Sequence, residues 1–489
     1  MGRHSKNVVG ENGINRRDTG YYSTPPFIAN YLCETLLTLK PDASVVYDPC
    51  VGRGELITPF RSSGVKIIGT DIIDFGAQSY FEFSKLDYLK AAATTIDSPL
   101  FKSEIPHSDL IVANPPYNCH EHDYLRQNKK HYIDVFGKSA FLNYYSLFVT
   151  ALVSLAEPGT FIGLITLDSF LTARGHEPLR DLLKRECKIH QVLLCPTDLF
   201  RSQGADVRTC ILILEKGGTA KSPIITLNRP VSTKEFETAL SKKSFDLVDY
   251  DQAFLSSPKD RGEFLIGVPS SISEMFSNIR LGEIFECKTG ISTGNDKEYL
   301  SKTKKLGYSV PFYKNPGNRR FFTSPDAYLC DDYVDVEKSV PNFMVRNKSY
   351  IGRSGITCSS MGVSFGAALM PEGGAFGVNP NIFASDQDVW WLLAYLNSSI
   401  CNYIVRGVLL RSNMITAGYV SRLPIPTLNA DTKNKLSTIA QEAHTSRPTP
   451  SESRIYVRAI DQLLFKALNL PEDDINIIIE FCSDIAKRS

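Results

Sequence analysis

The stretch Asp109-Leu110-Ile111-Val112-Ala113-Asn114-Pro115-Pro116-Tyr117 decides the fold. It begins as a short apolar run, which is typical of a strand buried on both faces of a parallel sheet. The run stops at two prolines, which cannot donate a ladder hydrogen bond and hold φ at about −65°. Because a residue before a proline is pushed toward extended geometry, Asn114 is restricted as well. The stretch therefore predicts a stiff loop at the carboxyl end of a buried strand, where open α/β sheets bind their ligands.

The polar groups of this loop suit a flat group that bears nitrogen. The Asn114 side-chain oxygen and the Pro115 carbonyl are acceptors for the two N–H bonds of an exocyclic amine, and the Tyr117 ring can stack on an aromatic base. Such an amine is a poor nucleophile because its lone pair is delocalised into the ring, and two acceptors would favour a pyramidal, more reactive nitrogen. An ordinary strand-to-loop turn also accounts for these residues, so the motif alone leaves both interpretations open.

A second strand-and-loop signal lies upstream, at residues 44–56. An apolar run ends at Asp48, a tight turn follows with Gly52 and Gly54, and a helix is expected through Ile57 and Phe60. This pattern is typical of the first strand of a nucleotide-binding sheet, where glycines let a ligand approach the backbone. The three-glycine dinucleotide fingerprint is absent, since Ile57 stands in the third position. A nucleoside cofactor is therefore favoured over one with a pyrophosphate.

The next strand ends strengthen this interpretation. Residues 65–71 read as a strand that ends at Asp71, about 20 residues after the glycine turn, as recognition of ribose hydroxyls requires. Asp87 offers a third acid beside Tyr88, before the strand at 110–113. Any one of these acids is more often a solvated loop carboxylate. Ligand-type residues at successive strand ends predict a nucleoside site at one edge of the sheet.

An N-terminal element precedes these strands. Thr24 is expected to cap a helix that begins with Pro25 and Pro26 and continues with helical apolar spacing.

In this order, the motifs resemble those of the amino-group DNA methyltransferases that use S-adenosylmethionine. The N-terminal place of the Thr-Pro-Pro element, with a target-recognition region last, is similar to the gamma-type adenine methyltransferases of restriction-modification systems. The resemblance rests on Thr24-Pro25-Pro26, Asp48-Pro49-Cys50-x-Gly52-x-Gly54, Asp71, Asp87 and Asn114-Pro115-Pro116-Tyr117, with Cys50 at a position where the family often has a small residue.

The resemblance also implies roles for these residues. The loop of Asp48, Pro49, Cys50, Gly52 and Gly54 would hold the methionine part of the cofactor. Asp71 would bind the ribose hydroxyls, Asp87 the adenine amine, Ile72 and Tyr88 the adenine faces, and Thr24 the carboxylate. The catalytic group would be Asn114, Pro115, Pro116 and Tyr117, with Phe200 packing on the extruded base opposite Tyr117. A lone Phe beside a strand is more often part of a core.

The remaining elements complete the expected fold. A helix at 143–155 and strands at 161–167, 193–194 and 210–214 extend the sheet. We expect an α/β fold: a Rossmann-like, mostly parallel methyltransferase sheet with helices on both faces, followed by a mixed α+β target-recognition domain. The polar, glycine-bearing segment at 216–222 predicts domains at 1–222 and 223–489, with C-terminal helices at about 428–489.

The second half resembles the target-recognition domains of restriction-associated methyltransferases. The resemblance rests on residues 288–294, a helix at 390–399 and Leu423-Pro424-Ile425-Pro426. Basic side chains of this half are candidates for reading bases or holding phosphates, although such charges usually lie on a solvated face: Lys297, Arg319, Arg320, Arg346, Lys348 and Arg353.

Composition narrows the class of protein. No run of about 18 apolar residues predicts a membrane span, and the N-terminus lacks the apolar core of a secretory signal. The 11 cysteines contain no Cys-x-x-Cys pair, which favours reduced thiols in a cytoplasmic protein. The formal charge of +1 argues neither for nor against nucleic acid. Cys119-His120-Glu121-His122 is too crowded for the usual zinc spacings, so no metal is expected.

The sequence therefore predicts a site-specific adenine methyltransferase that acts on double-stranded DNA, with S-adenosylmethionine as cofactor and the target base flipped out of the duplex. Only about 20 residues precede the cofactor motifs, so we expect any partner restriction endonuclease to be encoded separately. Three alternatives stay open. These are the amino group of cytosine, an RNA or protein substrate, and a non-catalytic DNA-recognition subunit, which the intact cofactor acids disfavour.

Overall fold

The computed structural model describes residues 21–76, 79–98, 103–117, 123–140, 143–205, 207–218, 221–317, 319–362, 364–409 and 414–487. The chain forms two compact units, Met1–Gly267 and Val268–Ser489. Each unit is described by itself. Within the ranges described, no helix is both long and apolar enough to cross a membrane.

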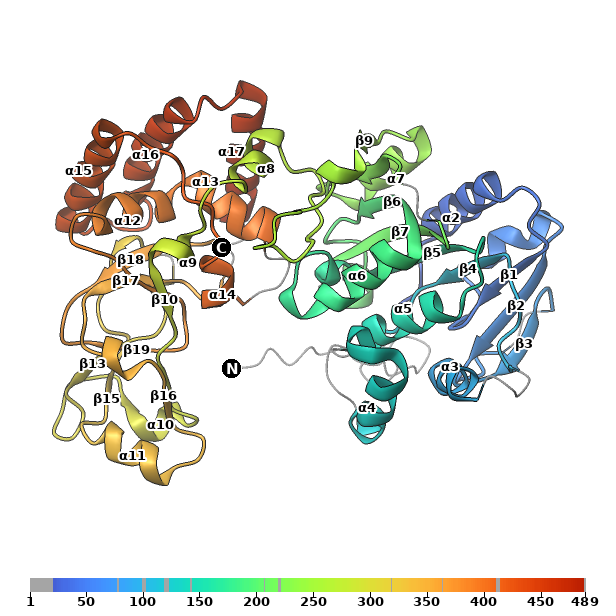
Figure 1. Cartoon of the computed structure of the whole chain (residues 1–489), viewed down its shortest axis with the longest axis horizontal. Helices are drawn as coiled ribbons and strands as arrows, with labels where there is room; N and C mark the ends of the chain where they lie inside the picture. Colours follow the sequence, from blue (N-terminus) through green and yellow to red (C-terminus); the bar gives the residue numbers. More distant parts are fainter. Residues whose placement is uncertain are drawn as a thin grey trace. The chain divides into compact units, whose positions relative to one another are not determined.

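The first unit is built on a nine-stranded sheet (Figure 1). Its strand order is β3-β2-β1-β4-β5-β7-β6-β8-β9, and neighbours are parallel except at β5–β7, β7–β6 and β8–β9. The strands are β1 (Val45–Asp48), β2 (Lys66–Asp71), β3 (Glu82–Lys85), β4 (Leu110–Ala113), β5 (Phe161–Leu167), β6 (Cys187–Leu194), β7 (Thr209–Lys216), β8 (Ile224–Leu227) and β9 (Asp246–Val248). This confirms the predicted mostly parallel α/β sheet.

The centre of the sheet contains the apolar run of the Asp109–Tyr117 stretch. Every residue of β4 and β5 is buried, as expected for strands covered on both faces. β4 pairs with β1 and with β5 in parallel register. β4 ends at Ala113, and Pro115 and Pro116 follow after Asn114.

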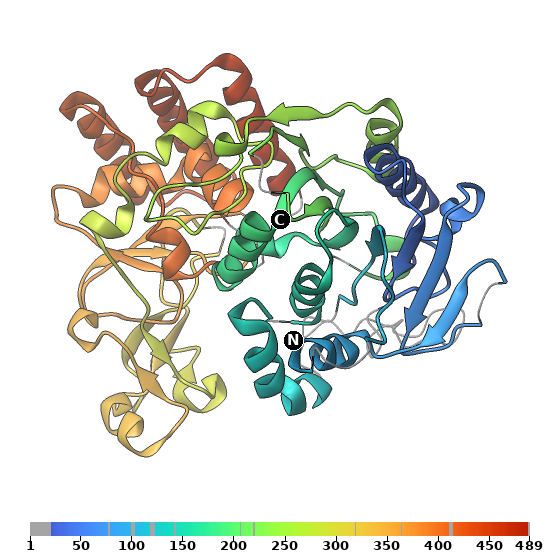
Figure 2. The same ribbon diagram turned by 45° about the vertical axis from the view of Figure 1, so that its right-hand side comes forward.

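Helices cover both faces of the sheet (Figures 1 and 2). One layer holds α3 (Tyr88–Asp97), α4 (Asp123–Phe136), α5 (Tyr144–Leu155) and α6 (Glu177–Glu186), which contact one another in succession. The other layer holds α2 (Pro26–Leu39) and α7 (Thr233–Lys242). Gly163 lets α2 lie close to β5, since a Cβ there would be 2.9 Å from Leu36.

Three expectations need correction. Pro25, not Thr24, is the N-cap of α2, because the Thr24 hydroxyl accepts a hydrogen bond from Asn114 instead. After Gly54 there is only a short 3-10 turn, η1 (Thr58–Ser62), rather than a full helix. The first unit extends to Gly267 rather than to residue 222, because β8 pairs with β6 and β9 pairs with β8.

The second unit is mixed α+β, with short strands joined by turns. A five-stranded sheet has the order β10-β20-β17-β18-β14, a four-stranded sheet the order β12-β15-β13-β19, and β11 pairs with β16. The longer strands are β13 (Val310–Tyr313), β17 (Gly355–Cys358) and β18 (Ala367–Met370). Its longer helices are α12 (Val389–Asn397), α15 (Ala430–Ser446), α16 (Ser453–Ala467) and α17 (Glu472–Lys487), near the ranges expected for the C-terminal helices.

Candidate active site

Asn114 lies at the carboxyl end of β4 and is held by the N-terminal segment. Its Nδ2 donates to the Tyr22 carbonyl at 2.9 Å and to the Thr24 hydroxyl at 3.0 Å. The Tyr22 carbonyl can only accept, so the atom that faces it must be the amide nitrogen. These contacts fix which way the Asn114 amide points, and they bring Thr24 next to the Asn-Pro-Pro-Tyr loop.

The other atom of this amide is an acceptor without a donor. Asn114 Oδ1 is buried and accepts no hydrogen bond within the part of the chain that the structure describes. A buried acceptor that lacks a partner costs about 1–3 kcal/mol, so such atoms in native proteins call for an explanation. A ligand N–H at this position would complete the coordination of the amide.

Three aromatic rings gather beside Asn114. Tyr117 stacks on Tyr22 with ring centroids 5.5 Å apart and planes at 21°. Phe200, in the loop after β6, meets the Tyr117 ring edge-on at 5.8 Å and 73°. Tyr117 and Phe200 are both buried. The structure therefore brings together the two rings that the sequence analysis assigned to the target base, and it adds Tyr22.

Asp48 ends β1 and is 1% exposed. Its Oδ1 accepts from the Cys50 backbone N–H at 3.0 Å. Burial raises the pKa of this carboxyl to about 8, and the nearby acids Asp71 and Glu55 add to the rise. A cationic ligand beside Asp48 would favour the ionised carboxylate and lower this pKa.

The glycine turn after Asp48 is joined to the end of β2. Gly52 and Gly54 have φ of +54° and +86°, which glycine adopts without strain. The Gly52 N–H donates to Asp71 Oδ2 at 2.9 Å, and the Ile73 N–H donates to Asp71 Oδ1 at 3.0 Å. Each carboxylate oxygen keeps capacity for a further donor, as a pair of ribose hydroxyls would supply. Burial raises the pKa of Asp71 as well.

The other predicted cofactor residues divide into exposed and buried ones. Ile72 is 58% exposed directly after Asp71, so its apolar side chain is available to a flat ligand. Asp87 caps α3 by accepting from the Lys90 N–H at 3.2 Å. The Tyr88 ring instead lies in the core, 5.0 Å from the Phe148 ring. Pro49 is buried, and Pro116 and Cys50 are half-buried.

Several contacts at this site were not expected from the sequence. Gln203 donates from Nε2 to the Ser23 carbonyl at 2.7 Å and accepts from the Ser23 N–H at 2.9 Å. This pair ties the Phe200 loop to the N-terminal segment. Arg229 donates to the Cys195 carbonyl in the same loop and forms an ion pair with buried Asp168 at the end of β5. Asp168 could have been found by the same strand-end rule, whereas no local pattern points to Gln203 or Arg229.

Tyr21 covers the glycine turn. A Cβ on Gly52 would be 2.6 Å from the Tyr21 ring. The Tyr21 hydroxyl donates to Glu55, and its ring stacks on Phe75 with centroids 5.3 Å apart. Tyr21 could have been predicted as a site residue from its position in the sequence, next to Tyr22 and close to Thr24.

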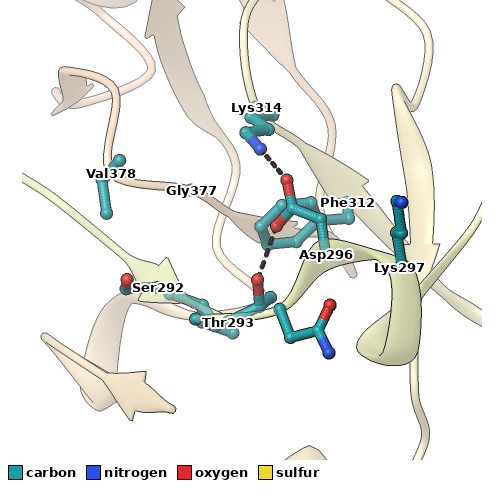
Figure 3. Close-up of a pocket in the computed structure, with 11 residues that line it drawn as sticks. Ser292, Thr293, Asp296, Lys297, Phe312, Lys314, Gly377 and Val378 are labelled. Carbon is teal, nitrogen blue, oxygen red and sulfur yellow. Dashed lines mark hydrogen bonds and ion pairs between the residues drawn. The ribbon is translucent and has the colours of Figure 1, made fainter. Parts of the chain in front are cut away.

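In the second unit, a cavity of about 500 Å³ is lined by Lys297, Lys314, Asp296 and Thr293, among others (Figure 3). Asp296 accepts from the Thr293 hydroxyl at 2.5 Å and forms an ion pair with Lys314. The other candidate DNA-contacting residues all have partners within the second unit. Two form ion pairs, Arg319 with Asp326 and Lys348 with Glu337. Arg320 donates to the Asn397 carbonyl, Arg346 contacts the Met344 sulfur, and Arg353 packs on the Tyr350 ring. Cys119, His120, Glu121 and His122 lie outside the described residues.

A mostly parallel sheet with acids at the ends of β1 and β2, a third acid capping α3, a glycine turn and an Asn-Pro-Pro-Tyr loop defines the class of α/β methyltransferases. Residues 82–264 match the N-6 DNA Methylase family. A curated relative, the Type II methyltransferase M.BanIII of Aneurinibacillus aneurinilyticus, is 23% identical over 218 residues, and the match covers 38% of this chain and 37% of that protein. The predicted resemblance to amino-group DNA methyltransferases is thereby confirmed over residues 82–264.

Two solved structures share the fold over most of the chain. One is the DrdV–DNA complex, with a TM-score of 0.55 and 11% identity over 88% of this chain and 58% of that one. The other is a nuclease-deletion mutant of the Type ISP restriction-modification enzyme LlaGI with a DNA substrate mimic, with a TM-score of 0.55 and 12% identity over 86% of this chain and 54% of that one. The chain thus spans little more than half of these chains and about a third of the curated relative.

Proposed function

We propose that this chain transfers a methyl group from S-adenosylmethionine to the exocyclic amino nitrogen of adenine in double-stranded DNA, at a specific site. The observation that carries the proposal is the buried Asn114 Oδ1, which accepts no hydrogen bond from the residues that the structure describes. It lies at the carboxyl end of β4 and between the acids of β1 and β2 and the rings of Tyr117 and Phe200.

The residues at the strand ends fit the cofactor. S-adenosylmethionine bears positive charge on its sulfonium and amino groups, and buried Asp48, whose pKa is raised to about 8, has the acids Asp71 and Glu55 among its charged neighbours. Asp71 would take the ribose hydroxyls and Ile72 one face of the adenine, with Asp87 near its amine. The cofactor supplies an electrophilic methyl group.

The chain's own contribution is to hold the amine. Asn114 Oδ1 and the Pro115 carbonyl would accept its two N–H bonds and turn the nitrogen lone pair toward the methyl group. Tyr117 and Phe200 would hold the base ring by stacking. The amine loses one proton as the new N–C bond forms. Amide oxygens are too weakly basic to keep that proton at neutral pH, so it passes to water.

DNA as the substrate is supported by the family and by the second unit. Both fold neighbours named above were solved with DNA or a DNA mimic. The second unit offers the size and short-strand texture of a target-recognition domain, and Lys297 lies at its cavity (Figure 3). A target base inside a duplex must leave the stack to reach Asn114, at a cost of a few kcal/mol. A separately encoded restriction endonuclease would be the partner of such an enzyme.

The test is methyl transfer from isotopically labelled S-adenosylmethionine to DNA, with nucleoside analysis and sequencing of the modified positions. We expect N6-methyladenine at one sequence context, and Asn114→Ala to abolish transfer while DNA binding persists. Asn30→Ala, on the exposed side of α2, is the matched control and should keep activity. N4-methylcytosine as the product, label in RNA or protein only, or near-normal activity of Asn114→Ala would contradict the proposal.

A further inference from the structure

The ring of Tyr22 lies on one face of Tyr117, the ring on which a target base would stack. The two rings stack at 5.5 Å and 21°, and Tyr22 also leans on Phe200 at 5.9 Å and 55°. With Tyr117 and Phe200 in edge contact at 5.8 Å, the three rings form a closed cluster.

This cluster has no room for a base between Tyr117 and Phe200. A planar base between two rings needs them parallel and about 7–8 Å apart, which is twice the contact distance between carbon atoms. The rings of Tyr117 and Phe200 are instead at 73°. At least one ring must therefore move before a base can stack on Tyr117.

Tyr22 is the ring best able to move. Tyr117 is 4% exposed and Phe200 1%, so each is enclosed by the core, whereas Tyr22 is only half-buried. We propose that the Tyr22 side chain is a placeholder, which covers the stacking face of Tyr117 and is displaced by the target base as the base inserts. This inference rests on the function proposed above.

The backbone contacts allow such a movement without loss of the site. The Tyr22 carbonyl is held by Asn114 Nδ2, and the N–H and carbonyl of Ser23 are both held by Gln203. Rotation of the Tyr22 side chain breaks none of these hydrogen bonds. Asn114 therefore keeps its orientation, with Oδ1 toward the incoming amine, while the ring leaves.

The exchange replaces one aromatic stack on Tyr117 by another. The apolar face of Tyr117 is then covered in both states, by Tyr22 before the base inserts and by the base afterwards. The stacking between Tyr22 and Tyr117 competes with the base, so its removal should favour insertion. An aromatic pair of this kind is expected to shift the insertion equilibrium by about two- to tenfold.

The experiment uses the full chain and a duplex that carries 2-aminopurine at the methylated position, once that position has been mapped. 2-Aminopurine fluoresces strongly only outside the base stack. For Tyr22→Ala we expect an insertion constant about two- to tenfold above that of the wild type, with a lower KM for DNA. Tyr22→Phe, which keeps the ring, should match the wild type. Tyr22→Leu should follow Tyr22→Ala, and it replaces that variant if Tyr22→Ala does not fold.

The outcomes separate the two proposals. If the wild type gives a fluorescence rise and both non-aromatic variants give an equal or smaller one, the placeholder is refuted and the proposed function stands. If the wild type neither methylates DNA nor raises the fluorescence, the proposed function fails and the placeholder fails with it. A purely structural role of the ring would lower the melting temperature without raising the insertion constant, and that result also refutes the placeholder.

Discussion

Replacement of Asp48 by Asn should make the protein more stable and less able to bind its cofactor. The Asp48 carboxyl is 1% exposed, and burial raises its pKa from 3.8 to about 8. Asn has the same size as the protonated acid and is likewise uncharged. Its side-chain oxygen can still accept from the Cys50 N–H, which in the wild type lies 3.0 Å from Asp48 Oδ1. The variant thus removes the ionisation and leaves the local contacts in place.

The sign and size of the effect follow from linkage. The pKa is raised in the folded state, so the folded chain holds a proton that the unfolded chain releases above pH 3.8. The wild type therefore loses stability as the pH rises from about 4 to about 8. At about 1.4 kcal/mol for each pH unit, the loss accumulated by pH 7 is about 4 kcal/mol. We expect Asp48→Asn to equal the wild type near pH 4 and to exceed it by up to this amount at pH 7.

Denaturant unfolding at a series of pH values measures this difference. Far-UV circular dichroism follows both units, while tryptophan fluorescence follows the second unit alone, because Trp390 and Trp391 are the only tryptophans of the chain. The fluorescence transition serves as an internal control, and Asp42→Asn, at an exposed acid, is the matched variant. A stability difference that does not grow between pH 4 and pH 8 would refute the reasoning. In calorimetry we expect Asp48→Asn to weaken S-adenosylmethionine binding by about 2–5 kcal/mol, as for loss of one member of a buried charge pair.

Three further changes test other parts of the structure. Gly52→Ala places a Cβ 2.6 Å from the Tyr21 ring at a φ of +54°. The melting temperature of the first unit in calorimetry should therefore fall by about 2–4 °C, and the affinity for the cofactor should decrease. Gly64→Ala is the control, because a Cβ there meets open space at a φ of +82° and should leave the affinity unchanged. Arg229→Met removes the ion pair of buried Asp168 and should lower the free energy of unfolding in urea by about 3 kcal/mol. The double variant Asp168→Asn/Arg229→Met should recover much of this loss, and additive losses would argue against this pairing. Lys297→Ala should reduce the slope of log K for DNA against log salt by about 0.9, and an unchanged slope would remove Lys297 from the phosphate contacts.

The central strands were predictable because their sequence carries both a burial signal and a stop signal. β4 is an uninterrupted apolar run, and β5 departs from one only at Gly163 and Thr166. The prolines that follow β4 after Asn114 are not tolerated in a central strand. The edge strand β3 (Glu82–Lys85) was not predicted, since it is short and mostly exposed and shows no apolar run. The boundary at Gly267 was also missed, because strand pairing of β8 and β9 outweighs the glycine-bearing segment at 216–222.

The candidate site shows the same division. The acids and the Asn-Pro-Pro-Tyr loop stand next to strand ends, so a local pattern carries their position. Tyr22 and Gln203 are positioned by contacts with residues that are distant in the sequence. The hydrogen bonds between Gln203 and Ser23, for example, join residues 180 positions apart. Such contacts depend on how the whole sheet closes, which no window of sequence contains.

The hydrogen bonds between Ser23 and Gln203 also limit how early during synthesis the site can form. A ribosome adds about 5–20 residues per second, so about 10–40 s separate the synthesis of these two residues. During that interval the Tyr22–Thr24 segment has been synthesised, but Gln203, which holds Ser23 through two hydrogen bonds, has not. A nascent chain arrested at the end of β6, before Gln203, should thus carry Asp48, Asp71 and Asp87 yet lack a competent site. Under the function that we propose, DNA methylation would begin only after the first unit has been completed.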